Sequence, residues 1–154
     1  MGDSIEARLA GLGVTLPQAA APAANYVPFM RSGDLLFTAG QLPLKDGKLA
    51  ATGLLGRDLD TAAGREAAKQ CAINVFAQAK AALGDLDFVR RLVKITVFVA
   101  STPDFTEQHL VANGASDFFV AALGEAGRHA RSAVGTASLP LNAPVEVEAV
   151  FEVE

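Results

Sequence analysis

One arginine stands out among the residues that could do chemistry, because it opens a predicted strand of small and apolar residues. Arg131 lies at the start of this strand, residues 130–137, where a buried guanidinium without a partner would be costly. Such a side chain must reach water or bind an anion, and its planar fork suits a carboxylate. Two interpretations stay open: Arg131 binds an anionic ligand, or it forms a salt bridge with a glutamate of the next strand.

Two glutamates in the last predicted strand are the acidic candidates. Glu146 and Glu148 lie two residues apart in Val145–Val153, so both side chains point to the same face of that strand. A partly buried carboxylate beside a second one can have a raised pKa, which suits proton transfer. Either glutamate could handle a water molecule, or both could be solvated strand residues.

Other catalytic groups are scarce in this sequence. The only histidines, His109 and His129, and the only thiol, Cys71, lack the spacing of metal ligands, so no metal site is expected. Cys71 lies on the apolar stripe of a predicted helix, where a buried structural thiol is expected. A pair of histidines that cleaves RNA is a weak hypothesis, because the acidic chain has no basic stripe to attract phosphates.

The composition limits the class of protein. Of the 154 residues, 51% are hydrophobic and 19% are charged, with a net charge of −4 and a mean hydropathy of +0.29. No apolar run approaches the ~20 residues of a membrane-spanning helix, so we expect the surplus apolar side chains to lie between subunits. The negative charge disfavours nucleic acid as a partner. The single cysteine and the acidic N-terminus, which is no secretory signal, predict a cytoplasmic protein.

The elements that must position these residues follow from periodicity and turn residues. Helices are expected at residues 3–12, 61–83 and 102–123, the first capped by Asp3 with Glu6 and the last broken at Asn113-Gly114. Strands are expected at residues 26–30, 35–39, 92–99, 130–137 and 145–153, with a further edge segment around an Asp46-Gly47 turn.

This order lacks the regular alternation of a doubly wound sheet. It predicts an α+β fold with helices on one face of a mixed sheet. Residues 1–20 are expected to form an N-terminal helix and connector, and residues 21–154 the main domain.

Five motifs, in this order, resemble those of the reactive intermediate deaminase family, also called YjgF or L-PSP endoribonuclease-like. They are Ala21-Pro22-Ala23-Ala24, Gly40-Gln41-Leu42-Pro43, Ala130-Arg131-Ser132-Ala133-Val134, Leu139-Pro140 and Val145-Glu146-Val147-Glu148-Ala149. The extra N-terminal helix and the segments 113–117 and 128–132 are similar to the longer, YjgF/chorismate mutase-like branch.

The resemblance implies a chorismate mutase-like fold of the bacillus type, with two main helices on one face of a mixed sheet and a short N-terminal helix. It also implies a homotrimer with active sites in the clefts between subunits. Family members typically hydrolyse 2-enamino or 2-imino acids to 2-keto acids and ammonia, without a metal or an organic cofactor. The expected partner is therefore a small-molecule carboxylate.

By the same resemblance, Arg131 would grip the substrate carboxylate and Glu146 would position or activate water. The remaining pocket residues implied are Tyr26, Phe29, Ala39, Gly40, Asn113, Ser132 and Ala133.

Three of these positions depart from the family pattern. Phe29 stands where a tyrosine is usual, Ala39 where a serine is common, and Ala133 where a cysteine is frequent. Tyr26 could restore one hydroxyl, although on an extended strand it would point to the other face from Phe29. These residues make the pocket more apolar than is usual in the family, which implies a larger, more apolar substrate or a loss of deaminase activity. Two alternatives stay open: a non-catalytic module that binds small carboxylates, and, more weakly, an endoribonuclease.

Overall fold

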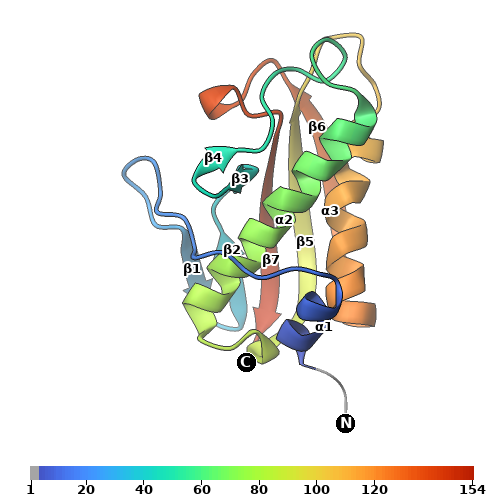
Figure 1. The fold of residues 1–154 in the computed structure, drawn as a ribbon. Helices are drawn as coiled ribbons and strands as arrows, with labels where there is room; N and C mark the ends of the chain where they lie inside the picture. The colour runs from blue at the N-terminus through green and yellow to red at the C-terminus, as the bar shows by residue number, and fades with distance from the viewer. Residues whose placement is uncertain (1–3) are drawn as a thin grey trace.

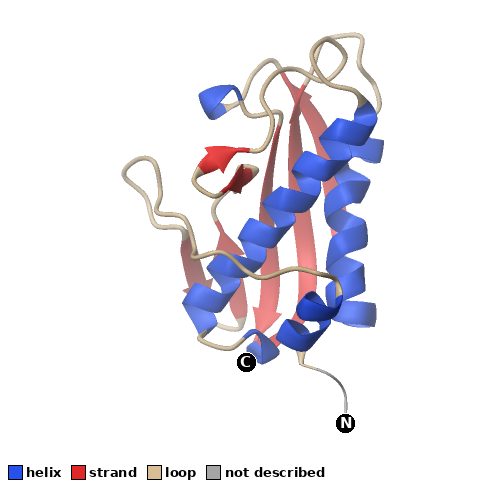
Figure 2. Cartoon of the chain, in the orientation of Figure 1, coloured by secondary structure: helices blue, strands red, loops and turns tan. Residues whose placement is uncertain are grey.

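The centre of the protein is a five-stranded mixed sheet with helices on one face (Figures 1 and 2). The computed structural model describes residues 4–154. In sheet order the strands are β1 (Phe29–Ser32), β2 (Leu35–Thr38), β7 (Val145–Val153), β5 (Val89–Ala100) and β6 (Ala130–Thr136). The β5–β6 pair is parallel and the other neighbours are antiparallel. The predicted α+β fold with a mixed sheet is confirmed.

Two long helices, α2 (Thr61–Leu83) and α3 (Gln108–Leu123), cover one face of the sheet (Figure 2). The predicted bounds of α2 are confirmed. Asp60 caps its N-terminus, because the backbone N–H of Ala63 donates to Asp60 Oδ1 at 2.8 Å. The three single-turn helices are η1 (Leu86–Phe88), η2 (Gly124–Gly127) and η3 (Pro140–Asn142). The opposite face of the sheet carries no helix from within residues 4–154.

Strand β7 shows how the sheet separates its two faces. Its residues alternate strictly: one set is buried under the helices, Val145, Val147, Ala149, Phe151 and Val153, and the other set faces the open side, Glu146, Glu148, Val150 and Glu152. Strand β1 begins at Phe29, three residues later than the sequence predicted. The reason is Pro28, which has no N–H to donate to a neighbouring strand.

The predicted turn at Asp46-Gly47 joins two short strands, β3 (Leu44–Lys45) and β4 (Lys48–Leu49). Both turn residues have positive φ, 54° and 79°, as a two-residue hairpin turn with right-handed strand twist requires. This hairpin forms a separate two-stranded sheet.

Helix α3 contradicts the prediction in two ways. It begins at Gln108, not near residue 102, and it runs unbroken through Asn113 and Gly114. Gly114 serves the contact between helices: a Cβ at this position would overlap the backbone carbonyl of Arg65 in α2. The glycine therefore permits close packing of α2 and α3 and does not end a helix.

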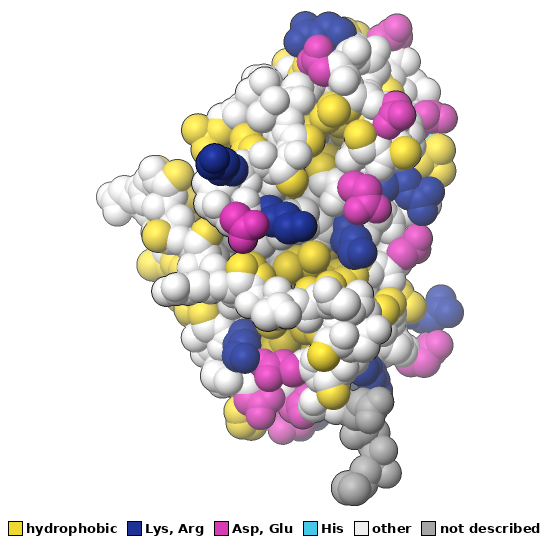
Figure 3. Space-filling model, viewed as in Figure 1, with side chains coloured by type: hydrophobic (Ala, Val, Ile, Leu, Met, Phe, Trp, Pro, Cys, Tyr) yellow, Lys and Arg dark blue, Asp and Glu magenta, His cyan; other side chains and the backbone are white. Residues whose placement is uncertain are grey.

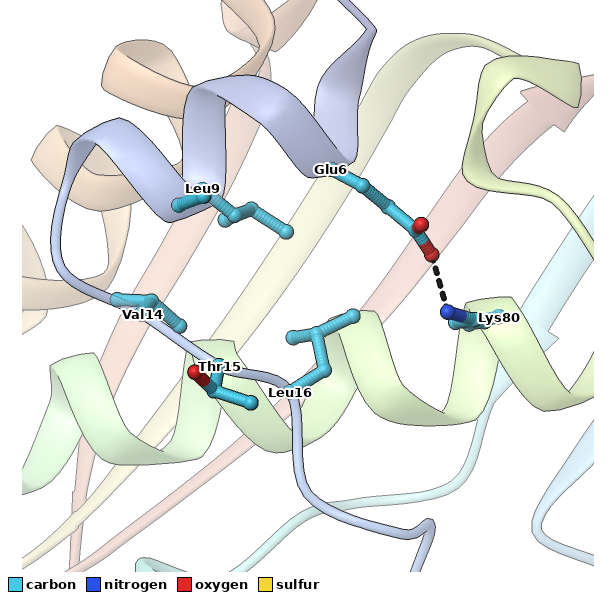
Figure 4. A pocket seen from close by; sticks show the side chains of 7 residues that line it. Glu6, Leu9, Val14, Thr15, Leu16 and Lys80 are labelled. Carbon is cyan, nitrogen blue, oxygen red and sulfur yellow. Dashed lines mark ion pairs between the residues drawn. The ribbon is translucent and has the colours of Figure 1, made fainter.

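The N-terminal helix α1 (Ile5–Gly11) packs against α3 and the single-turn helix η1 (Figure 1). Ser4 Oγ caps it by accepting from the N–H of Ala7 at 3.0 Å, and the predicted cap, Asp3, lies outside the described residues. Leu9 joins the main hydrophobic core. Figure 4 shows Leu9, Val14 and Leu16 around a cavity of about 250 Å³, with an ion pair between Glu6 and Lys80 at one side. The proposed boundary near residue 20 stays a prediction.

The face that carries the helices has no stripe of one charge. Figure 3 shows Lys and Arg side chains interspersed with Asp and Glu over this face. Within the described part of the chain, no helix is both long and apolar enough to cross a membrane.

The contact at Gly114 gives a direct test of the helix packing. We expect Gly114→Ala to lower the free energy of unfolding by about 1–3 kcal/mol, because the added methyl group forces α2 and α3 apart. Urea unfolding followed by circular dichroism measures this change. The control is Gly11→Ala in α1, where a Cβ would meet no atom within 4 Å. Equal stability of the Gly114→Ala variant and the wild type would contradict the packing.

Candidate functional site

Arg131 lies on the outermost strand of the sheet and reaches under the edge of helix α3. Its register partner in β5 is Ile95, which is buried against the helices, so the arginine points to the helix-covered face. Arg131 Nη1 donates to Asn113 Oδ1 at 2.8 Å and to Ser116 Oγ at 3.0 Å. Arg131 Nη2 donates to the backbone carbonyl of His109 at 3.1 Å. Helix α3 thus supplies all three acceptors.

The acceptors of Arg131 are neutral, and this is the central electrostatic feature of the site. Among the residues that the structure describes, no carboxylate forms a salt bridge with this half-buried guanidinium. The salt bridge to the next strand, considered from the sequence, therefore does not form within residues 4–154. A partly buried positive charge held only by dipoles favours an anionic ligand.

The hydrogen bonds leave two N–H donors of the guanidinium unused among the described residues. An arginine has five N–H donors, and three of them are used by Asn113, Ser116 and His109. The remaining donors, Nε–H and one Nη2–H, have no acceptor in the described part of the chain. A carboxylate can accept from two adjacent nitrogens of an arginine at once, so these donors suit bidentate binding.

Behind Arg131 lie two residues that sequence reasoning did not connect with it. Ser116 Oγ lies 2.8 Å from His129 Nε2, and His129 Nδ1 lies 2.6 Å from the backbone carbonyl of Gly127. The sequence separation of Ser116 and His129 from predicted site residues could have indicated both. Ser116 follows Asn113 by three residues on one helix face, and His129 precedes Arg131 by two. The expected break at Asn113-Gly114 concealed the first relation.

Glu146 lies on the other face of the sheet. Its partner in β5 is Phe98, while the next residue, Val147, is buried under the helices. A Cβ on Gly40 would overlap the carboxyl group of Glu146, so the glycine leaves the space that this side chain occupies. Gln41 fixes the position of the neighbouring Gly40. Its backbone N–H donates to the carbonyl of Val147 at 2.8 Å, and its carbonyl accepts from the N–H of Val147 at 3.0 Å.

The surroundings of Glu146 change its acidity. Burial raises the pKa of the Glu146 carboxyl above its usual value, and the nearby Glu148 raises it further. A carboxyl with a raised pKa can take up and return a proton nearer neutral pH than an ordinary glutamate. Cys71 is fully buried as predicted, and burial raises the pKa of its thiol well above the usual value. This thiol is therefore a poor nucleophile.

Two of the predicted pocket residues line a small cavity of about 80 Å³. Tyr26 and Gly40 lie there with Gln41, Gln78 and Leu141. Gln78 Nε2 donates to the carbonyl of Ala20 at 2.9 Å and to Gln41 Oε1 at 3.3 Å, which ties the N-terminal connector to α2. Gln41 and Gln78 were not predicted.

The other predicted pocket residues lie apart from that cavity. Phe29 and Ala133 pack against the hydrophobic core. Ser132 lies on the open face, beside Thr96 in the register of the sheet. The N–H of Ala39 donates to the carbonyl of Pro28 at 2.9 Å.

The predicted site residues therefore form two groups within one chain. Arg131 and Asn113 lie at the helix-covered edge of the sheet, while Glu146 and Gly40 lie at its open face. The sheet itself separates the two groups, so one chain does not bring Arg131 and Glu146 together. A site that uses both would need two copies of the chain. Within residues 4–154, no group of three or more His, Cys, Asp or Glu side chains could hold a metal ion.

Comparison with known proteins agrees with the fold. A family described as "YjgF/chorismate mutase-like, putative endoribonuclease" matches residues 6–153. Protein TCP17 of Trypanosoma cruzi is 54% identical over 149 residues, which is 96% of this chain and 93% of that protein. The structure of Atu1372 from Agrobacterium tumefaciens, a protein of unknown function, is 58% identical with a TM-score of 0.92, and the match covers 97% of this chain and 92% of that one. E. coli TdcF with bound serine is 26% identical with a TM-score of 0.66, over 89% and 94% of the two chains.

The raised pKa of Glu146 predicts how stability depends on pH. We expect Glu146→Gln to raise the free energy of unfolding near pH 7, because folding disfavours the ionised carboxylate. Below the unfolded-state pKa of glutamate the wild-type carboxyl is protonated in both states, so the advantage disappears there. The gain therefore grows as the pH rises from that value through the higher pKa of the folded state.

Urea unfolding across this pH range, at one protein concentration, measures the difference. Glu66→Gln on the exposed side of α2 is the control that removes the same charge. A gain for Glu146→Gln that does not change with pH would contradict the raised pKa.

Proposed function

The chain belongs to the YjgF/chorismate mutase-like family, and on this premise we propose that it hydrolyses small 2-enamino or 2-imino acids. The products are 2-keto acids and ammonia. The observation that carries this proposal is the half-buried Arg131, whose acceptors are all neutral and whose Nε/Nη2 donors stay open. The bound serine of E. coli TdcF supports it, because serine carries the same α-carboxylate group.

The chemistry needs positioning more than a nucleophile. The carbon of a protonated imine is already electrophilic, so a carboxylate held by Arg131 fixes this carbon relative to one water molecule. Glu146 accepts a proton from that water as its oxygen bonds to the carbon, and the proton passes to the nitrogen. The tetrahedral intermediate then expels ammonia while Glu146 takes the proton of its hydroxyl group, which leaves the keto group, and this proton passes to the departing ammonia. An enamine substrate first takes a proton from solvent at its β-carbon and becomes the protonated imine.

The proposed site lies between subunits, with Arg131 from one copy and Glu146 from another. The opposite faces on which these two residues lie support this arrangement. The open face also exposes apolar side chains, among them Met30, Phe37 and Val134, which a second copy could cover. The proposed assembly is the homotrimer implied by the family resemblance. The proposed location is the cytoplasm, which suits the single free and buried Cys71.

A non-catalytic module that binds small carboxylates is the second candidate. Ala133 supports it, since this residue replaces a frequent thiol of the family and packs against the core. On the Arg131 side of the sheet, the groups that contact the guanidinium bind and orient but carry no carboxylate. The two candidates share the anchor and differ only in turnover.

A coupled assay tests the proposal. A serine or threonine dehydratase generates 2-aminoacrylate or its four-carbon analogue, and the rate of pyruvate or 2-ketobutyrate formation is followed with and without the protein. We expect acceleration by the wild type and a roughly 10–100-fold loss in Arg131→Ala, because a charge-assisted pair is removed. Arg128→Ala, an exposed arginine three residues away, is the matched control and keeps the acceleration.

Each other outcome has a distinct meaning. Acceleration that survives Arg131→Ala contradicts the proposal. If the wild type gives no acceleration but binds 2-keto acids in calorimetry, and Arg131→Ala abolishes this binding, the second candidate holds. RNA cleavage that survives Arg131→Ala and is lost in His129→Ala would instead support the ribonuclease hypothesis.

A further inference from the structure

With a neutral His129 imidazole, the hydrogen bonds behind Arg131 can be satisfied by only one arrangement of protons. The backbone carbonyl of Gly127 can only accept, so His129 Nδ1, 2.6 Å away, must carry a hydrogen. In a neutral imidazole the other nitrogen, Nε2, is then an acceptor. It lies 2.8 Å from Ser116 Oγ.

Ser116 links Arg131 to His129 by two further hydrogen bonds, which donate in the same direction. Arg131 Nη1 can only donate, so Ser116 Oγ accepts from it at 3.0 Å. The hydroxyl hydrogen of Ser116 is therefore free to donate to His129 Nε2. Each group donates to the next, from Arg131 through Ser116 and His129 to Gly127. We call this chain of three hydrogen bonds the relay.

The far end of the relay is fixed in the core. Gly127 is buried, and a Cβ there would overlap the backbone of Phe119 and Val120 in α3. The ring of His129 also meets the ring of the buried Phe119 edge-on, with centroids 6.2 Å apart. The imidazole therefore has a defined position, which limits how Ser116 and the guanidinium can rotate.

We propose that Ser116 and His129 are positioning residues that hold Arg131 for a carboxylate. This inference rests on the proposed function and adds to it two residues and a binding geometry. The relay and Asn113 occupy both Nη1 hydrogens and the carbonyl of His109 occupies one at Nη2, so Nε–H and the second Nη2–H are left for a ligand. A planar fork held in one orientation binds a planar carboxylate at two points, whereas a carboxamide offers only one acceptor oxygen. The site should therefore require the free acid.

Two pairs of variants separate positioning from general damage to the fold. Ser116→Ala removes the hydroxyl, while Ser116→Thr keeps it. His129→Asn keeps a donor toward Gly127 but lacks an atom at the Nε2 position, whereas His129→Gln offers an acceptor there. Ser138→Ala, which removes an exposed hydroxyl outside the site, is the control.

The first measurement is calorimetric binding of 2-ketobutyrate and of its amide. We expect the wild type, Ser116→Thr, His129→Gln and Ser138→Ala to bind the acid. Ser116→Ala should bind it about tenfold more weakly, as loss of one hydrogen bond to a charged group implies. His129→Asn, which removes the acceptor of the Ser116 hydroxyl, should also bind it more weakly. The amide should bind weakly to every protein. Equal affinity of all the variants for the acid would overturn the relay and leave the proposed function standing.

The second measurement does not depend on a ligand. Nitrogen NMR follows rotation of the Arg131 guanidinium about its Cζ–Nε bond, assigned with Arg131→Lys. We expect slow rotation in the wild type and in Ser116→Thr, and faster rotation in Ser116→Ala and His129→Asn. If the wild type binds no carboxylate, the proposed function fails while this measurement still tests the relay. Rotation that is equally fast in the wild type and Ser116→Ala would overturn it.

Discussion

The cost of partly burying an uncompensated positive charge is the constraint on which the account of this protein depends. Arg131 emerges from an edge strand beneath α3, and its acceptors within residues 4–154 are all neutral: Asn113, Ser116 and the carbonyl of His109. These dipoles lower the cost of desolvation but leave the charge unneutralised. A bound anion would neutralise the positive charge of Arg131. The two unused donors, on Nε and Nη2, also favour a carboxylate, because its two oxygens can accept from two adjacent nitrogens.

The sheet places the two candidate catalytic residues, Arg131 and Glu146, on opposite faces. Strand alternation sends Arg131 toward the helices and Glu146 toward the open face, while Gly40 leaves the space that the Glu146 carboxyl fills. In the proposed site, one chain supplies Arg131 and a second chain supplies Glu146. The same open face carries the exposed apolar side chains that a further copy could bury. Assembly and catalysis are therefore linked in this account, since one contact would cover the apolar surface and unite the two halves.

Much of this could be predicted from the sequence, for identifiable physical reasons. Helix α2 was predictable because Asp60 and Gly84 mark its ends, and β7 because its alternation is strict. Gly114 misled the prediction, since close packing between helices and helix termination both select glycine and leave the same signal in one chain. That error hid the relation of Ser116 to Asn113. The absence of a salt bridge to Arg131 could not be predicted, because it depends on which face each glutamate takes in the finished sheet.

The most direct test of the central claim is a subunit-mixing experiment on imine hydrolysis. Arg131→Ala and Glu146→Ala are each expected to be inactive, because every site in the proposed homotrimer would lack one of the two residues. When the two variants are unfolded, mixed in equal amounts and refolded, about a quarter of the sites should pair an intact Arg131 with an intact Glu146 from different copies. Recovery of roughly that fraction of the activity of refolded wild type is the predicted result. A mixture that stays inactive, while refolded wild type recovers, would contradict a site shared between two copies.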